Sequence, residues 1–259
     1  MGEPQSDKQG LKLSSGSGKA VRDQDVQENW GVDSFDPATI PVPGEKGLNL
    51  YDYIVKKEGR KPSFFGRYLT HRQKTAELTS KEAQFLLDLE CRILLFHAAG
   101  MWFGAVRKVG AEGITSGRLA AQTAIAAATK LSVPDSVYIY ANIEPEWEPT
   151  TDWMLGWWKA FGDSAYEGSG FYCGASAFKP FTRAVETANQ QFDERTRKQR
   201  PVLWFTQPSS NPTSGAMPRP ADNPFAVQGW QYGFSRGKPN FQYDVNVATD
   251  NALTRMWSL

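Results

Sequence analysis

The sequence predicts an α/β fold: a (β/α) TIM-type barrel of eight strands, with helices missing near the C-terminal end. Three observations predict it. Short β-rich runs alternate with helical stretches from residue 30 to about residue 207. A long Pro-, Ser- and Asn-rich loop follows, and two strand-like runs then stand without room for a helix between them. Such alternation predicts parallel strands with right-handed crossovers, and an open α/β sheet is the alternative.

The strands are predicted from short runs of β-branched, aromatic and other apolar residues. The run CRILLFHAA at 91–99 is continuously apolar, as expected for a strand that is covered on both faces. The predicted strands cover residues 30–35, 64–69, 91–99, 137–144, 169–175, 200–207, 227–234 and 241–248.

One helix is predicted after each of the first five strands. The helix at 50–58 ends at Gly59, and residues 79–82 (TSKE) have the form of a capping box that begins the next helix. Trp153 and Trp157 lie four residues apart, so they should dock the fourth helix onto the barrel. The predicted helices cover residues 50–58, about 79–90, 115–131, 152–161 and 176–191.

Residues 1–28 are predicted to be a flexible polar N-terminal tail, and residues 29–259 the barrel. The tail is rich in Gly, Ser, Lys, Asp and Gln and has no hydrophobic periodicity. It lacks the apolar core of a signal peptide, and no apolar run in the chain approaches the ~20 residues of a membrane span. We therefore expect no membrane span, and action on the cell wall after export by a non-classical route, or else a cytoplasmic location.

The composition excludes several classes of function. The 29 Lys and Arg residues nearly balance the 28 Asp and Glu residues, and the net charge is +1. Nucleic-acid binders usually have a basic excess, so we expect no nucleic-acid partner. The chain has no Gly-rich phosphate-binding motif, and its 2 Cys and 2 His do not form a metal-ligand pattern. We expect neither a metal nor a cofactor.

Three carboxylates occur at predicted strand ends, where barrel enzymes carry their sites: Asp33, Glu144 and Asp244. Asn142 lies two residues before Glu144, and Asn246 two residues after Asp244, so each pair faces one side of its strand. Carboxylates that supply acid and base, together with aromatic rings that stack on sugars, are typical of glycoside hydrolysis. Besides Asn142 and Asn246, the candidates for substrate binding are Arg67, Tyr68, His97, Tyr172, Trp204, Gln207, Trp230 and Tyr232.

Several of these residues also have a structural interpretation. Asp33 could cap the loop that follows it. Glu144 could form an ion pair with Arg67, and His97 could be a satisfied, buried histidine. Most of the Trp residues could pack in the core or at the rim.

The motifs GVDSF, FFGRYL, IYANIE, FYCGAS, LWFTQP, GWQY and YDVN occur in this order along the chain. In this order they resemble the glycoside hydrolase-like barrel domains related to family-25 lysozymes, and more narrowly the uncharacterised bacterial branch of that group. The resemblance extends over about residues 30–259. It implies cleavage of the β-1,4 bond between N-acetylmuramic acid and N-acetylglucosamine in peptidoglycan.

The resemblance also implies roles for single residues. It implies that Glu144 is the general acid, and that Asp33 and Asp244 position or polarise the sugar. Members of the family carry an Asp-x-Glu pair on the fourth strand, and here Asn142 stands where the Asp would be. Asparagine can hydrogen-bond an acetamido group, but it cannot stabilise developing positive charge as a carboxylate does.

Three hypotheses of function follow. The first is a lysozyme-like muramidase that acts on peptidoglycan or a related polysaccharide, with Glu144 as acid and Asp33 or Asp244 as second carboxylate. The second is a catalytically inactive barrel that binds glycan through its aromatic rim. The third is a structural or effector component of a phage-like or secretion assembly, in which a partner orders the tail.

Overall fold

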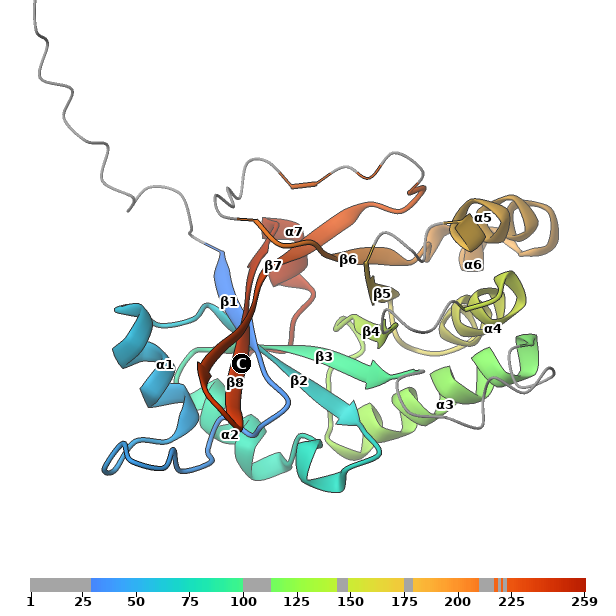
Figure 1. Cartoon of the computed structure of the whole chain (residues 1–259). Coiled ribbons are helices and arrows are strands. Elements are labelled where there is room, and N and C mark those ends of the chain that lie inside the picture. Colours follow the sequence, from blue (N-terminus) through green and yellow to red (C-terminus); the bar gives the residue numbers. More distant parts are fainter. Residues whose placement is uncertain are drawn as a thin grey trace, which may run out of the picture.

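Strands that are neighbours in the sequence are also neighbours in the sheet, and the sheet closes when the last strand pairs with the first (Figure 1). The computed structural model describes residues 29–99, 113–143, 149–174, 179–209, 217–218, 220 and 223–259. Within these residues eight strands form a closed barrel, which confirms the predicted fold class and excludes an open sheet. The predicted tail, residues 1–28, lies outside the described residues.

The strands are β1 (Trp30–Asp33), β2 (Phe64–Thr70), β3 (Arg92–Ala98), β4 (Ile139–Asn142), β5 (Ser169–Cys173), β6 (Val202–Thr206), β7 (Val227–Lys238) and β8 (Phe241–Ala248). The helices are α1 (Leu50–Glu58), the 3-10 turn η2 (Lys74–Ala76), α2 (Ser80–Asp88), α3 (Ile114–Lys130), α4 (Thr151–Gly162), α5 (Lys179–Gln191), α6 (Glu194–Lys198) and α7 (Asp250–Thr254). Each of the first five strands is followed by a helix, as predicted. The described residues between β6 and β7 contain no helix.

The last strand departs from the predicted pattern. β1 to β7 pair in parallel in sequence order, but β8 is antiparallel to both β7 and β1. The cause is the short connection: Pro239 and Asn240 alone join β7 to β8, and a two-residue loop can join only antiparallel strands. The parallel pairing predicted from the strand–helix alternation therefore holds for β1 to β7 and does not extend to β8, which no helix separates from β7. Its amino end lies beside the carboxyl ends of the parallel strands.

Polar side chains begin the helices. Asn49, Thr79 and Thr150 each accept a hydrogen bond from the backbone amide three residues later, at 2.8, 3.2 and 3.2 Å, which satisfies one of the free amides of the first turn. The Thr79 cap confirms the predicted start of α2. The capping box is only half formed, however, because the carboxylate of Glu82 binds Arg67 instead of returning to the cap.

Aromatic rings fill the interior of the barrel. Phe64, Phe96, Tyr140, Tyr172 and Trp204 point inward, and their ring centroids lie 4.8 to 6.4 Å apart in edge-to-face contacts. Such contacts stabilise a core beyond the area that they bury. The barrel is therefore a packed core rather than a pore, and any reaction must take place at one of its ends.

Two further sets of contacts complete the core. Helices α1 to α5 lie outside the barrel (Figure 1), and outward side chains such as Val32 belong to one hydrophobic cluster with helix residues such as Ile54 and Trp157. The residues after β8 cover the amino-terminal end of the barrel, where Met256 packs against the interior rings and Trp257 pairs with the backbone of Ile93. None of the described helices is long and apolar enough to cross a membrane.

The interior packing predicts that one methyl group added at Gly229 destabilises the protein. A Cβ on Gly229 would lie 2.2 Å from Cε3 of Trp204, which is fully buried. Gly229→Ala should therefore lower the free energy of unfolding by roughly 1–3 kcal/mol through overpacking, measured by urea denaturation. Gly113→Ala is the matched control, because no atom lies within 4 Å of a Cβ there. Equal stabilities of the two variants would contradict this packing.

Candidate active site

The carboxylate of Asp33 lies at the barrel mouth, by which we mean the end that carries Asp33, Asp244 and Asn142. Asp33 ends β1 and pairs with Asp244 of the antiparallel β8, so both side chains point into the barrel. Asn246 donates from Nδ2 to Oδ2 of Asp33 at 2.6 Å and accepts the indole N–H of Trp204 at 2.9 Å. Because the indole is only a donor, it directs the NH2 group of Asn246 to Asp33.

Both oxygens of Asp244 accept hydrogen bonds. Gln231 donates from Nε2 to Oδ2 at 2.5 Å, and the backbone amide of Ser235 donates to Oδ1 at 2.6 Å. Burial raises the pKa of Asp244, and these two hydrogen bonds oppose the rise because they stabilise the ionised form. Asp244 reaches the mouth because β8 is antiparallel, which also puts Asn246 deeper in the barrel than Asp244.

The end of β4 adds polar groups on the opposite side of the mouth. Asn142 is buried, and its Nδ2 donates to the hydroxyl of Tyr68 on β2 at 2.8 Å. Tyr172 pairs with Asn142 in register and packs its ring against Phe96, with centroids 4.8 Å apart. Glu144, the predicted general acid, lies outside the described residues.

Arg67 lies outside the mouth, contrary to the prediction that it binds substrate. Strand alternation turns it away from the interior, and its Nε donates to Oε1 of Glu82 at 2.7 Å, with both side chains almost fully buried. Its Nη1 donates to the carbonyls of Ser34 and Phe35 at 2.6 and 2.8 Å, and Nη2 to that of Ala76 at 3.0 Å. Arg67 therefore fixes the loop that follows Asp33.

The buried ion pair predicts that truncation of Arg67 strongly lowers the stability of the fold. Arg67→Ala leaves the carboxylate of Glu82 buried and unpaired, and should lower the free energy of unfolding by about 3–5 kcal/mol. Lys198→Ala is the matched control, because Lys198 pairs with Glu194 at 2.8 Å with side chains 76% and 74% exposed. Chemical denaturation should show little change for this exposed pair. A similar loss in both variants would contradict a special role of Arg67.

His97 also lies outside the mouth, contrary to its predicted role in substrate binding. Its neighbour Phe96 points into the barrel, so His97 points to the helices and stacks near Trp157, with ring centroids 5.6 Å apart. Its Nδ1 is hydrogen-bonded to Oγ1 of Thr70 at 2.5 Å. Burial lowers the pKa of His97 to about 4, so the ring is neutral at neutral pH.

The lowered pKa of His97 predicts a pH dependence of stability. In the unfolded chain its pKa is about 6.5, so acid protonates the unfolded form first. The free energy of unfolding therefore has its full value above pH ~6.5 and falls as the pH drops toward 4. The loss between pH 7 and pH 5 is roughly 2 kcal/mol. Urea unfolding of wild type and His97→Asn at pH 7 and pH 5 checks this. The wild type should lose more stability than the variant on acidification, and equal losses would contradict it.

Four other predicted residues occupy different places. Trp204 is fully buried in the interior and has no face open to a sugar. Trp230 and Tyr232 point away from the interior, since they alternate with Gly229 and Gln231, and they are each 6% exposed in the core around the barrel. Gln207 is exposed just beyond β6, and its carbonyl accepts the indole N–H of Trp230 at 2.8 Å. The structure thus does not bring the three aromatic residues to the mouth.

His71 is a mouth residue that the sequence analysis did not assign to the site. It follows β2 directly and is 7% exposed, and its ring lies 5.0 Å from the rings of both Phe35 and Tyr68. Its Nδ1 accepts the backbone N–H of Gln73 at 3.0 Å, and burial lowers its pKa. Tyr68 was selected because it lies at the end of a predicted strand. His71 follows the same strand, so extending that selection past the strand end would have included it.

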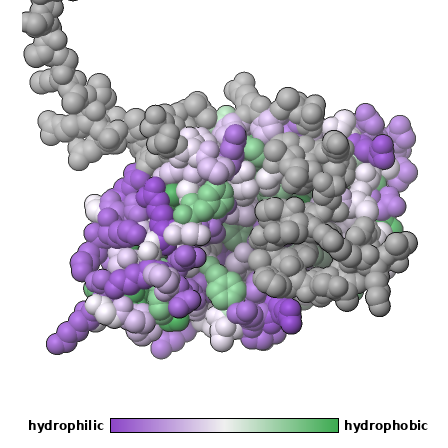
Figure 2. Space-filling view, in the orientation of Figure 1, coloured by the Kyte–Doolittle hydropathy of each residue, from purple (hydrophilic) through white to green (hydrophobic). Residues whose placement is uncertain are grey.

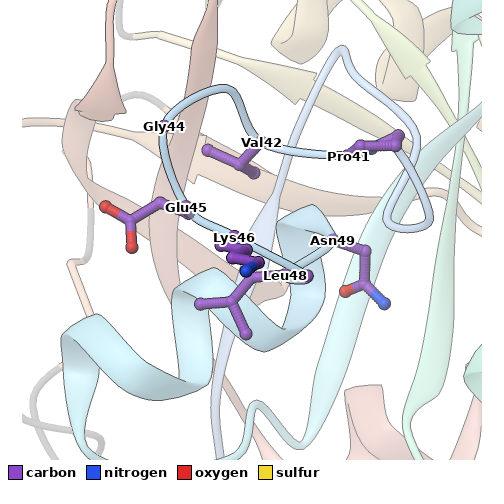
Figure 3. A pocket seen from close by; sticks show the side chains of 8 residues that line it. Pro41, Val42, Gly44, Glu45, Lys46, Leu48 and Asn49 are labelled. Carbon is purple, nitrogen blue, oxygen red and sulfur yellow. The ribbon is translucent and has the colours of Figure 1, made fainter.

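A pocket of about 570 Å³ lies in the loop between β1 and α1 (Figure 3). Its lining residues fall between Pro41 and Asn49, and the titratable ones are Glu45 and Lys46. Asp33 and Asp244 are not among them, so we assign the site to the mouth and not to this pocket. Among the described residues, no cluster of three or more His, Cys, Asp or Glu side chains could hold a metal ion.

The closed eight-stranded barrel defines the protein as a TIM-type barrel. Residues 58–248 match the family described as Rv2525c-like, glycoside hydrolase-like domain, and the chain belongs to this family. Comparison of the sequence with curated proteins finds no match.

Several solved structures have a similar fold. An uncharacterised protein of B. stearothermophilus is 25% identical, with a TM-score of 0.64 over 88% of this chain and 100% of that chain. The Tat-secreted protein Rv2525c of Mycobacterium tuberculosis is 14% identical, with a TM-score of 0.52 over 89% and 99%. The spore cortex lytic enzyme SleM of Clostridium perfringens is 14% identical, with a TM-score of 0.51 over 85% and 67%. The last two similarities establish the fold alone.

Proposed function

We propose that this protein is a cell-wall glycoside hydrolase that cleaves β-1,4 bonds in peptidoglycan, with Glu144 as general acid. The observation that carries the proposal is the carboxylate of Asp33, held at the barrel mouth by Asn246 and paired in register with Asp244. Membership of a glycoside hydrolase-like family and the fold shared with a spore cortex lytic enzyme support it. The site of action would then be the cell wall.

The hydrogen bonds of the two mouth aspartates favour different roles. Both oxygens of Asp244 are occupied by Gln231 and Ser235, so Asp244 suits a positioning residue. The Asn246 amide donates to Oδ2 of Asp33, and this hydrogen bond favours the ionised carboxylate. We assign Asp33 as the second carboxylate because it ends β1 at the mouth. It stabilises the positive charge that develops on the sugar while Glu144 protonates the leaving oxygen, and water then attacks the anomeric carbon.

Substitution of either carboxylate tests the proposal. Glu144→Gln and Asp33→Asn should each reduce the release of muropeptides from purified peptidoglycan by at least about 10²-fold, because each removes a charge or proton needed in the transition state. Chromatography with mass detection measures the products. Asp88→Asn is the control, because Asp88 lies on α2 and contacts Gln84. Release that is equal in wild type and Glu144→Gln would exclude Glu144 as the acid.

A barrel that binds glycan without cleaving it is the second candidate, and Asn142 favours it. Asn142 stands where related lysozymes carry the Asp of the Asp-x-Glu pair, and its amide donates to Tyr68. If the missing carboxylate limits catalysis, Asn142→Asp should raise muropeptide release by about 10-fold or more. Binding of peptidoglycan without products, by both wild type and Asn142→Asp, would favour the binding function instead.

A further inference from the structure

We propose that Phe35 and Phe234 are aromatic platforms that hold two sugar rings of a β-linked glycan, one on each side of the Asp33–Asp244 pair. The inference rests on the proposed function, because it names the groups of the same mouth that bind the glycan. Neither residue was assigned to the site from the sequence.

The ring of Phe35 is exposed but rigidly held. Phe35 follows Asp33 by two residues and is 38% exposed. Its carbonyl accepts a hydrogen bond from Nη1 of Arg67 at 2.8 Å. Its ring packs edge-on against the ring of His71, with centroids 5.0 Å apart and an interplanar angle of 83°. A ring that is already ordered loses little conformational entropy when a ligand covers it.

The register of the β7–β8 hairpin turns Phe234 to the mouth. Gln231 pairs with Asn246 and Gly233 pairs with Val245, so one extra residue of β7 is inserted there. Val245 faces the helices, and Gly233 opposite it faces the same way. Phe234 comes next on β7, so alternation predicts that its side chain faces the mouth, and the residue is 44% exposed.

A second irregularity fixes this position. The next pair after Gly233–Val245 is Arg236–Tyr243, so Phe234 and Ser235 stand together opposite Asp244. Ser235 has φ of +51°, a left-handed conformation that is costly for a residue other than glycine. Asp244 holds this conformation by accepting the amide of Ser235 at 2.6 Å. Bulges of this kind re-aim side chains beside active sites.

The order of the strands sets the two rings on opposite sides of the carboxylates. The consecutive strands are β2, β1, β8 and β7. Phe35 leans on His71 beyond β2, Phe234 lies on β7, and Asp33 and Asp244 lie between them on β1 and β8. In Figure 2, apolar surface lies at the centre of the face shown, beside hydrophilic surface over α1 and α2.

The charges at this rim favour a neutral ligand that donates hydrogen bonds. Asp33 and Asp244 bring carboxylates to this rim, and their negative charge repels an anion and favours a neutral ligand such as a sugar. The basic residues Arg236 and Lys238 of the hairpin form ion pairs with other residues. Nη1 of Arg236 lies 3.1 Å from Oε2 of Glu58, and Nζ of Lys238 lies 2.9 Å from Oε1 of Glu45. Flat apolar rings beside carboxylates match a sugar, which has apolar C–H faces and a polar edge.

Co-sedimentation with purified peptidoglycan tests the platforms. Phe35→Ala and Phe234→Ala should each raise the apparent Kd about tenfold, and Phe234→Trp should retain binding because it keeps an aromatic face. Leu119→Ala is the matched control, since Leu119 is a 63% exposed apolar residue on α3. Thermal melting should change little in all four variants, because each altered residue is more than a third exposed.

The outcomes separate this inference from the proposed function. If wild type binds and both alanine variants bind equally well, the platforms are overturned, whereas muropeptide release still decides the proposed function. A Phe234→Trp variant that binds as weakly as Phe234→Ala would also overturn the stacking role of Phe234. If wild type neither binds peptidoglycan nor releases muropeptides from it, the proposed function falls and the platforms fall with it.

Discussion

The ion pair between Arg67 and Glu82 is the constraint on which the candidate site depends. Both side chains are buried, so the cost of removing two charges from water must be met by their attraction and by further hydrogen bonds. Arg67 supplies these bonds by donating to the backbone of Ser34, Phe35 and Ala76. One guanidinium thus joins the exit of β1, the strand β2, the turn η2 and helix α2, and it fixes the segment that carries Asp33.

The aromatic interior supports the same aspartate from below. Trp204 is locked among Phe64 and Tyr140, and its indole N–H orients Asn246, which in turn orients Asp33. A core residue with no access to solvent therefore controls a carboxylate at the mouth. Such support is needed wherever a reacting group must be held to within a fraction of an ångström.

Much of the fold could be predicted from the sequence, because strand runs, the Thr79 cap and the missing late helices are local signals. It could not be predicted from the sequence which side chains at the strand ends point into the barrel and which point to the helices. Alternation says that Asn142 and Glu144 share a face, but not whether that face is the interior, and the same uncertainty misassigned Arg67 and His97. The direction of β8 follows from a two-residue turn, and the exposure of Phe234 follows from a bulge. Both depend on pairing rather than on composition.

The antiparallel direction of β8 also determines at which end of the barrel the chain leaves the sheet. It carries the chain away from the mouth, and Trp257 ends against Ile93 at the amino-terminal end of β3. Asn29, at the start of β1, lies at this end too, since it donates to Asp250 at 2.7 Å. A label, carrier or solid support attached beside Trp257 would therefore hold the protein by its base. The mouth would face outward, open to an insoluble polymer as large as a cell wall.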